Sequence, residues 1–97
     1  MAYVYILYSP AAKRFYIGSC LELSDRLNEH RDKKHAGSFT ARYSDWELYF
    51  TIADLSYLQA RKVEQHIKKM KSRKYIENLV LYPEIAMGLI ERYKSPF

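Results

Sequence analysis

The sequence predicts an α+β fold, a small three-stranded antiparallel sheet with helices packed on it. Two short segments near the N-terminus are rich in β-branched and aromatic residues, and a connection short enough for a hairpin joins them. A third such segment lies mid-chain, and much of the rest has capping residues followed by helical spacing of apolar positions. The chain has 97 residues, which is the usual size of one compact domain, so we expect a single domain over residues 1–97.

Three segments are expected to be strands. Residues 3–8 read Tyr-Val-Tyr-Ile-Leu-Tyr and are closed by Ser9 and Pro10, a pattern that favours a strand ending in a turn. Residues 15–20 form the second strand, and the short connection between the two predicts an antiparallel hairpin. Residues 46–52 read Trp-Glu-Leu-Tyr-Phe-Thr-Ile and are the candidate for the third strand.

The first and last helices are indicated by their first residues. Ser24 is expected to cap a helix over residues 25–34, whose first residue is an acid where the helix dipole favours one. Residues 36–45 are expected to form a loop. Pro83 suits the first turn of a last helix over residues 84–92, because proline has no N–H to leave unsatisfied there.

The two middle helices also begin at serines. Ser56 is expected to cap a helix that ends at about Met70, and Ser72 another that ends at about Leu81. The apolar positions of the first of these are spaced three, four and three residues apart, which predicts one buried stripe. That stripe consists of Ala60, Val63, Ile67 and Met70.

The chain is basic, with a net charge of +5 and a pI of about 9.3. Seven basic residues and one acid, Glu64, lie between Arg61 and Lys74, so this segment carries +6. A basic balance favours an anionic partner, with nucleic acid first and an acidic membrane surface second. The basic helix lacks tryptophan and its apolar stripe is expected to face the core, so we expect no membrane partner.

The single cysteine, Cys20, excludes an internal disulfide and a CxxC metal site. It has no evident base partner, so we expect it to pack in the core. The N-terminus has no basic region before an apolar stretch, and no apolar run approaches the roughly 20 residues that span a bilayer. These features predict a cytoplasmic protein.

Two tyrosines of the expected hairpin, Tyr5 and Tyr16, are candidates for chemistry because strand pairing brings them to one region of the sheet. Gly18 follows closely, and a strand glycine often marks a close backbone approach. Aromatic packing is the alternative for all three. Arg26 and His30 lie four residues apart and share a helix face that could hold a phosphate and move a proton; a solvated polar face is the alternative.

Glu64 is the lone acid of the basic segment, and one carboxylate there suits a divalent metal, since Mg²⁺ commonly takes one or two carboxylates, waters and substrate phosphates. An ordinary helix pair with Lys68 is the alternative.

His35 and His66 show no metal-ligand spacing and are expected at the surface or in loops. The basic side chains after Glu64 are candidates for phosphate contacts, with a solvated helix surface as the alternative. They are Lys68, Lys69, Lys71, Arg73 and Lys74.

Together these residues resemble the GIY-YIG nuclease superfamily, most of all its compact stand-alone bacterial members related to the nuclease domain of the UvrC excision-repair subunit. The first motif corresponds to Val4, Tyr5 and Ile6, where the usual Gly-Ile-Tyr is degenerate. The second motif is clear and ends at Gly18 in Tyr-Ile-Gly. The degenerate start removes no side chain that does chemistry.

The later motif positions are also filled. Arg26 stands ten residues after the second tyrosine, and His30 four residues further. Glu64 precedes an Ile-Lys pair as the family glutamate does, and Asn78 is the candidate for a downstream asparagine whose spacing varies. The resemblance covers about residues 3–81, and the combined spacing is much more specific than either motif alone.

This resemblance implies a central three-stranded antiparallel sheet flanked by helices and phosphodiester hydrolysis with one divalent ion, Mg²⁺ or Mn²⁺. Glu64 is then the metal ligand, and Arg26 neutralises charge in the transition state. Tyr5 or Tyr16 orients or deprotonates the attacking water with help from His30. Which tyrosine is the base stays open, and Gly18 and Asn78 are supporting residues.

The expected function is therefore a metal-dependent endonuclease that acts on nucleic acid, with DNA expected, in repair or recombination. The alternative is a catalytically silent nucleic-acid-binding module of the same fold. The intact set of candidate residues favours the enzyme. A domain of this size has little room to read sequence, so specificity is expected to be weak or supplied by a partner protein.

Overall fold

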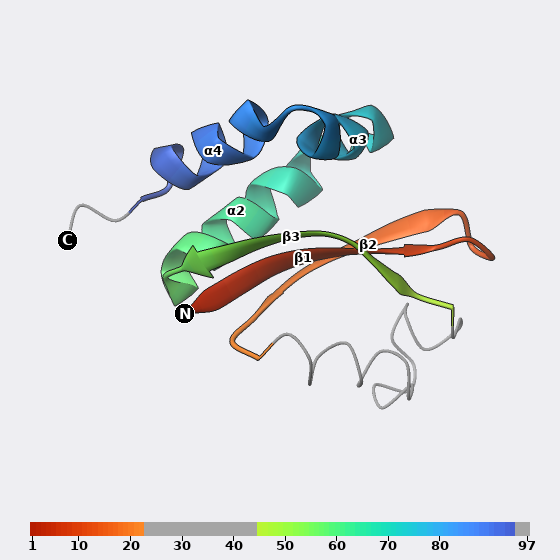
Figure 1. Cartoon of the computed structure of the whole chain (residues 1–97), viewed down its shortest axis with the longest axis horizontal. Coiled ribbons are helices and arrows are strands. Elements are labelled where there is room, and N and C mark those ends of the chain that lie inside the picture. Colours follow the sequence, from red (N-terminus) through yellow and green to blue (C-terminus); the bar gives the residue numbers. More distant parts are fainter. Residues whose placement is uncertain (23–44, 95–97) are drawn as a thin grey trace.

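The computed structural model describes residues 1–22 and 45–94, and its centre is a three-stranded antiparallel sheet with strand order β2-β1-β3 (Figure 1). The strands are β1 (Ala2–Ser9), β2 (Arg14–Cys20) and β3 (Glu47–Leu55). Three helices follow in the described part of the chain, α2 (Tyr57–Met70), α3 (Arg73–Leu81) and α4 (Pro83–Arg92). The predicted α+β fold is confirmed. The helix expected over 25–34 and most of the loop expected over 36–45 lie outside the described residues.

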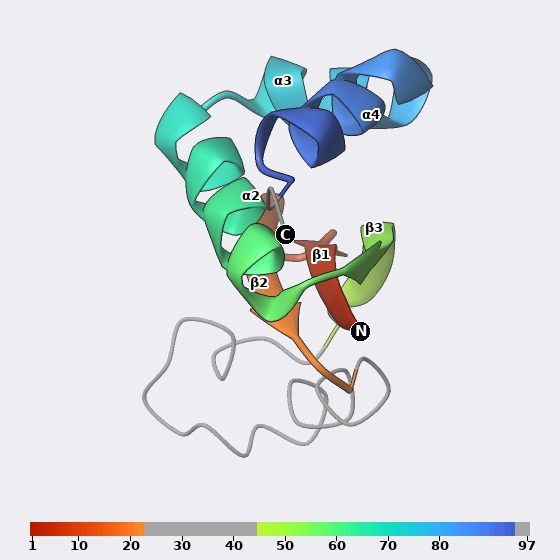
Figure 2. The same cartoon turned by 90° about the vertical axis from the view of Figure 1, so that its left-hand side faces the viewer.

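The sheet has two different faces, because successive side chains of a strand point to opposite sides. One face, the helix face, carries Val4 and Ile6 of β1, which are buried with Val63 and Ile67 of α2 in the main core. Helix α2 lies against β1 and β2, and α3 and α4 pack on the same side (Figures 1 and 2). The other face, the tyrosine face, carries a second buried cluster. Its members are Tyr5, Leu7, Cys20 and Trp46, with Tyr3 and Tyr16 packed against them.

The turn between β1 and β2 is held by Asp45, which directly precedes Trp46 and β3. Its carboxylate accepts a hydrogen bond of 2.5 Å from the Ser9 hydroxyl and one of 2.7 Å from the Ala11 N–H. These bonds lower the pKa of Asp45. Lys13 closes the turn with a positive φ of 54° and an N–H bond of 2.7 Å to the Ser9 carbonyl. The turn that carries the first basic residues of the chain is thus tied to the start of β3.

Strand β3 runs three residues beyond its predicted end at Ile52. Leu55 still pairs with Ala2, but the register shifts between Ala2 and Val4. Asp54 has a positive φ of 62° there, which is one way for a strand to accommodate an extra residue in a bulge. A bulge breaks the alternation of side chains, so the pattern of residues 53–55 does not read as strand.

Helices α2 and α3 begin as predicted. Ser56 and Gln59 form a reciprocal capping box at the start of α2, and the Ser72 hydroxyl accepts the third N–H of α3. Lys71 ends α2 in the left-handed conformation, with φ 47°. The prediction that Met70 belongs to the buried stripe is wrong, since its side chain is exposed. Met70 is the last residue of α2, where the chain turns away towards α3.

Candidate active site

Tyr5 and Tyr16 lie beside each other on the tyrosine face, with ring centroids 6.3 Å apart and planes tilted by 32°. The hairpin register places Tyr5 opposite Gly18 and Tyr16 opposite Leu7. Tyr5 is only 2% exposed, whereas Tyr16 is half-buried. The Trp46 ring meets the Tyr16 ring in an edge-to-face arrangement, with ring centroids 6.4 Å apart. Strand pairing therefore brings the two tyrosines together, as the sequence predicts, and Tyr16 is the more accessible of the two.

Gly18 makes room for the Tyr5 ring. A Cβ atom at Gly18 would lie 2.6 Å from Cζ of Tyr5 and still closer to its hydroxyl oxygen. Real Cβ atoms essentially never approach other atoms so closely, so the Tyr5 ring needs the bare backbone of a glycine beneath it. The predicted close approach at Gly18 is confirmed, and the group that approaches is the phenol of Tyr5.

Glu64 lies on the inner side of α2 and is 8% exposed. One carboxylate oxygen accepts a hydrogen bond of 2.5 Å from the hydroxyl of Ser19 on β2. The other accepts a hydrogen bond of 2.6 Å from the ammonium group of Lys68, one helical turn further along. Both oxygens are thus bonded, which fixes the orientation of the carboxylate. The helix pair between Glu64 and Lys68 is therefore present. Glu64 also bonds Ser19 of β2, a contact that a pair within one helix does not explain.

The donor set around Glu64 fits a single hard cation. No group of three or more His, Cys, Asp and Glu side chains gathers within residues 1–22 and 45–94. Mg²⁺ needs no such cage, because it keeps several waters and takes substrate phosphates beside one or two carboxylates. Glu64 is the residue that would hold Mg²⁺ or Mn²⁺, and Ser19 would orient it. An ion there would compete with the ammonium group of Lys68.

The tyrosines and Glu64 approach β2 from opposite faces. Tyr16 and Gly18 belong to the tyrosine face, while Ser19, which bonds Glu64, belongs to the helix face. In the sheet that residues 1–22 and 45–94 form, β2 is an edge strand, so the two faces meet along its outer edge. A phosphate bound at that edge would face described groups of both sides of the sheet.

Three predicted site residues remain outside this geometry. Arg26 and His30 lie outside the described residues. Asn78 is half-buried on α3, where its carbonyl accepts an N–H bond of 2.8 Å from Tyr82 at the end of the helix. The roles predicted for these three residues stay predictions.

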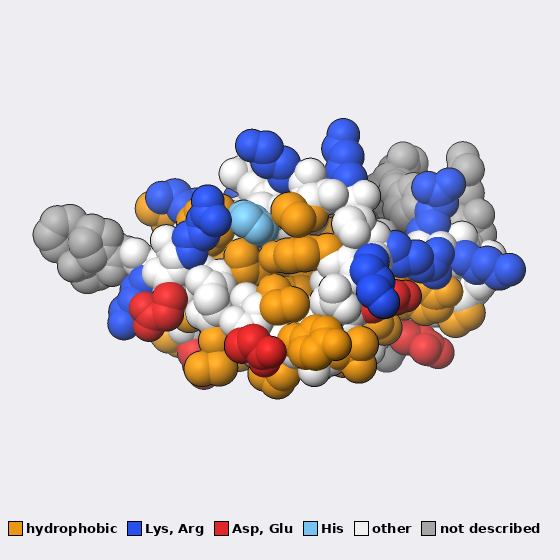
Figure 3. All heavy atoms as spheres, turned by 90° about the horizontal axis from the view of Figure 1, so that it is seen from above, with side chains coloured by type: hydrophobic (Ala, Val, Ile, Leu, Met, Phe, Trp, Pro, Cys, Tyr) orange, Lys and Arg blue, Asp and Glu red, His pale blue; other side chains and the backbone are white. Residues whose placement is uncertain are grey.

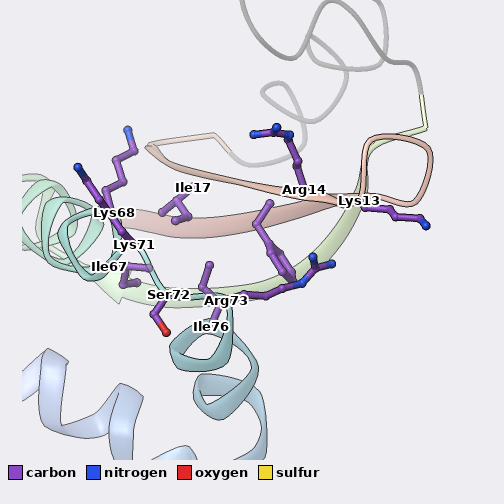
Figure 4. A pocket seen from close by; sticks show the side chains of 10 residues that line it. Lys13, Arg14, Ile17, Ile67, Lys68, Lys71, Ser72, Arg73 and Ile76 are labelled. Atoms are coloured by element: carbon purple, nitrogen blue, oxygen red, sulfur yellow. The ribbon is translucent and has the colours of Figure 1, made fainter.

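A basic groove of about 390 Å³ lies between β2 and the junction of α2 and α3 (Figure 4). Its floor is apolar and consists of Phe15, Ile17, Ile67 and Ile76. Its cationic rim consists of Lys13, Arg14, Lys68, Lys71 and Arg73. The Arg73 guanidinium lies 5.5 Å from the Phe15 ring centroid and donates a hydrogen bond of 3.2 Å to the hydroxyl of Tyr8. This contact joins the start of α3 to the hairpin, and both elements line the groove.

The structure divides the five predicted phosphate contacts. Three of them, Lys68, Lys71 and Arg73, line the basic groove. Lys69 lines a different hollow beside Lys62, and Lys74 is exposed on α3. Lys13 and Arg14 of the groove and Ser19 of the Glu64 contact were not predicted from the sequence. Their only local signals were the basic pair in the hairpin turn and the serine that follows Gly18.

His66 is partly exposed and borders a surface hollow. It is half-buried on α2, and its Nδ1 atom lies 2.8 Å from the hydroxyl oxygen of Tyr93 after α4. Burial lowers the pKa of His66, and the positive charges of Arg92 and Lys69 lower it further. The sequence predicts that His66 lies in the helix capped by Ser56. It does not predict that the end of α4 packs against this histidine, because that contact is tertiary.

The model of the GIY-YIG catalytic domain matches residues 1–76. The chain belongs to the GIY-YIG family. This catalytic domain indicates nuclease-type activity, and it covers the sheet, the tyrosines and Glu64 but ends before Asn78. A comparison with curated proteins found no match, and a comparison with solved structures found none either. Within residues 1–22 and 45–94, this GIY-YIG protein has no helix long and apolar enough to cross a membrane.

Proposed function

We propose that this GIY-YIG protein is an endonuclease that hydrolyses phosphodiester bonds in DNA with one divalent ion, Mg²⁺ or Mn²⁺, held by Glu64. The observation that carries the proposal is the setting of Glu64. Its carboxylate is nearly buried, oriented by Ser19 of the edge strand, and joined through Lys68 to a groove with a cationic rim. A lone carboxylate beside a phosphate-binding surface is the arrangement in which protein and substrate share one ion.

In this proposal the ion supplies Lewis acidity towards the scissile phosphate and its leaving oxygen. Glu64 binds the ion, and Ser19 keeps the carboxylate in one orientation. Tyr16 or Tyr5 orients or deprotonates the attacking water from the tyrosine face. Arg26 and His30 keep the roles that the family resemblance gives them, which are charge neutralisation and assistance in proton transfer.

The basic groove is the proposed binding surface for the DNA backbone. Lys68 has two roles in this proposal. Without an ion its ammonium group pairs with Glu64, and when an ion takes that place the side chain is released towards a phosphate in the groove. This exchange is inexpensive, because half of the Lys68 side chain is exposed and exposed ion pairs contribute only about 0.2–1 kcal/mol.

The second candidate is a catalytically silent DNA-binding module of the same fold. The Lys68–Glu64 pair favours it specifically, because the carboxylate is already satisfied without an ion. Such a module would use the basic groove but would need neither Glu64 nor the tyrosine hydroxyls.

A panel of labelled substrates separates the two candidates. The protein is incubated with duplex, nicked, branched and single-stranded DNA and with matching RNA, each in Mg²⁺, Mn²⁺ and EDTA. The matched control is Glu64→Ala, which should bind DNA at least as well as the wild type because it removes a negative charge beside the groove. Cleavage that needs the ion and is absent in Glu64→Ala supports the endonuclease. Binding without cleavage across the whole panel supports the module, and equal cleavage by Glu64→Ala removes Glu64 from the site.

The pathway, the compartment and the extent of the domain are proposed from the sequence and the family resemblance. We place the activity in DNA repair or recombination in the cytoplasm, on one domain over residues 1–97. The groove offers a cationic rim and an apolar floor but few groups for reading base edges, so a partner protein is proposed to supply specificity.

A further inference from the structure

A second cationic surface lies between α2 and α4, apart from the basic groove. It is a hollow of about 700 Å³, here called the α2–α4 hollow. Its polar lining consists of Lys62, Gln65, His66, Lys69, Arg92 and Tyr93. A smaller hollow next to it shares Lys62, Arg92 and Tyr93 and adds Lys94. Seen from the helix side, lysine and arginine side chains border the pale-blue histidine (Figure 3).

Helical geometry separates this surface from the groove. Lys62, His66 and Lys69 are four and three residues apart, so they form one stripe along α2. Glu64 and Lys68 form another stripe, and at about 100° per residue the two stripes point in roughly opposite directions. One straight run of phosphates cannot contact both stripes. Lys69 therefore belongs to the second surface, although it is adjacent in sequence to Lys68 of the groove.

Acidic side chains of residues 1–22 and 45–94 do not pair with the cations of the hollow. The ion pair between described side chains is Lys68–Glu64, and neither Lys62, Lys69 nor Arg92 pairs with an acid of the described residues. The Arg92 guanidinium lies over the Tyr93 ring at 5.6 Å, which leaves its N–H groups available to an anion. Several positive charges gathered without acids raise the local affinity for anions.

The hollow has a fixed shape because its wall is bonded across two elements. The Nδ1 atom of His66 lies 2.8 Å from the Tyr93 hydroxyl, and the two rings meet edge to face at 5.7 Å. The Tyr75 ring of α3 lies 6.2 Å from His66 on another side. These contacts hold the end of α4 against α2 and so fix Arg92 relative to Lys69.

We propose that the α2–α4 hollow is a second binding site for nucleic-acid backbone phosphates, used for a different segment of the substrate from the one in the basic groove. Lys62 and Lys69 are seven residues apart, so they lie about 10 Å apart along the helix axis. That distance spans several phosphates of one strand at about 3.4 Å of rise per nucleotide, which suits a backbone better than a single small anion. The choice of nucleic acid as the ligand rests on the proposed function.

The test compares two variants that each remove two charges, in EDTA so that DNA stays intact. The hollow variant is Lys62→Ala with Lys69→Ala, and the groove variant is Lys71→Ala with Arg73→Ala. The probe is a duplex of about 30 base pairs, which at about 3.4 Å per step is far longer than the 38 Å length of the protein. Affinity is measured against salt concentration, and each lost phosphate contact should lower the slope of log affinity by about 0.9.

A second readout locates the DNA. Backbone amide NMR signals of Arg92 and Tyr93 report on the hollow, and those of Arg73 report on the groove. We expect both variants to flatten the salt slope. We also expect DNA to shift the α4 signals in the wild type and in the groove variant but not in the hollow variant.

The failures of the two proposals are distinguishable. If the hollow variant keeps the wild-type slope and DNA leaves the α4 signals unmoved, while the groove variant weakens binding, the hollow is overturned and the proposed function stands. If wild-type protein binds no DNA, both are overturned. If inorganic phosphate moves the α4 signals as far as DNA does at the same phosphate concentration, the hollow is a simple anion site and its assignment to a nucleic-acid backbone is wrong.

Discussion

The two faces of strand β2 position their functional groups in different ways. On the tyrosine face Tyr5 is held by burial, with its phenol pressed over the backbone of Gly18. On the helix face Glu64 is held by directed bonds from Ser19 and Lys68. Ring packing is disturbed by a change in side-chain volume, whereas a charge-assisted hydrogen bond is disturbed by removal of its donor. Variants of the tyrosine face should therefore be sensitive to side-chain volume and ring chemistry, and variants of the helix face to the loss of a donor.

The largest effect is expected from Tyr16→Phe on the tyrosine face. The variant keeps the ring and its packing against Tyr5 but removes the hydroxyl. Cleavage should slow by roughly 10²-fold or more, the scale of a lost acid–base group, while the melting temperature changes little. Tyr5→Phe should have a comparable effect. Single-turnover cleavage and thermal denaturation of both variants measure the two quantities.

The same assay tests how the tyrosines act. If one of them attacks phosphorus directly, end-labelled DNA will remain linked to the denatured protein. We expect no such adduct, because water is the proposed nucleophile. A trapped adduct would refute hydrolysis by water, and full activity in both Phe variants would remove the tyrosines from catalysis.

Gly18→Ala tests the shape of the tyrosine face. The added methyl group would overlap the Tyr5 phenol, and overpacking of this kind costs about 1–3 kcal/mol of unfolding free energy. The matched control is Gly88→Ala in α4, where a Cβ meets nothing within 4 Å and removal of a helical glycine should stabilise slightly. Thermal melts should move in opposite directions for the two variants. A Gly18→Ala protein as stable as wild type would mean that Tyr5 is not held as described.

Ser19→Ala tests the directed bonds of the helix face. A hydrogen bond to a charged group contributes about 1.5–3 kcal/mol, so a misaligned Glu64 should lower kcat by roughly tenfold or more. KM for DNA should stay near its wild-type value, because Ser19 positions Glu64 and does not touch the substrate. Ser19→Thr keeps the hydroxyl and should restore most of the rate. Equal rates for the Ala and Thr variants would show that the hydroxyl is not what positions Glu64.

The smallest effect is expected from Lys68→Met, which removes the cation that competes for Glu64. The Lys68 side chain is half exposed, and exposed ion pairs contribute about 0.2–1 kcal/mol, so affinity for Mn²⁺ should rise only about 1.4- to fivefold. Lys69→Met is the control, since it removes the same charge from the neighbouring position of α2, which lines the α2–α4 hollow and does not contact Glu64. Calorimetric titration measures both. Identical Mn²⁺ affinities in the two variants would show that Lys68 does not compete with the ion.

Local chemistry explains what the sequence could predict. Ser56 and Ser72 cap helices through bonds to residues three positions away, so the signal is contained in a few letters. The β-branched and aromatic residues located β1 and β2, and the short connection between them indicated a hairpin that brings Tyr5 and Tyr16 to one region of the sheet. Gly18 was singled out as a close approach because few other reasons place glycine inside a strand.

Long-range contacts explain what the sequence could not predict. Ser19 and Glu64 are 45 residues apart, and no pattern along the chain relates them. Lys13 joins the basic groove only because the hairpin turn lies beside the start of α3. Met70 is exposed because α2 ends there, and the contact of His66 with Tyr93 joins residues 27 positions apart.

The central claim is that one ion at Glu64 serves groups on both faces of β2, and the most direct test is relaxation by Mn²⁺. Small amounts of Mn²⁺ are added to the wild type and to Glu64→Ala, and the NMR signals of the Ser19 amide and the Tyr16 ring are followed. The account predicts that both signals broaden together in the wild type and that neither broadens in Glu64→Ala. Broadening that persists in Glu64→Ala, or broadening of Ser19 without Tyr16, would contradict it.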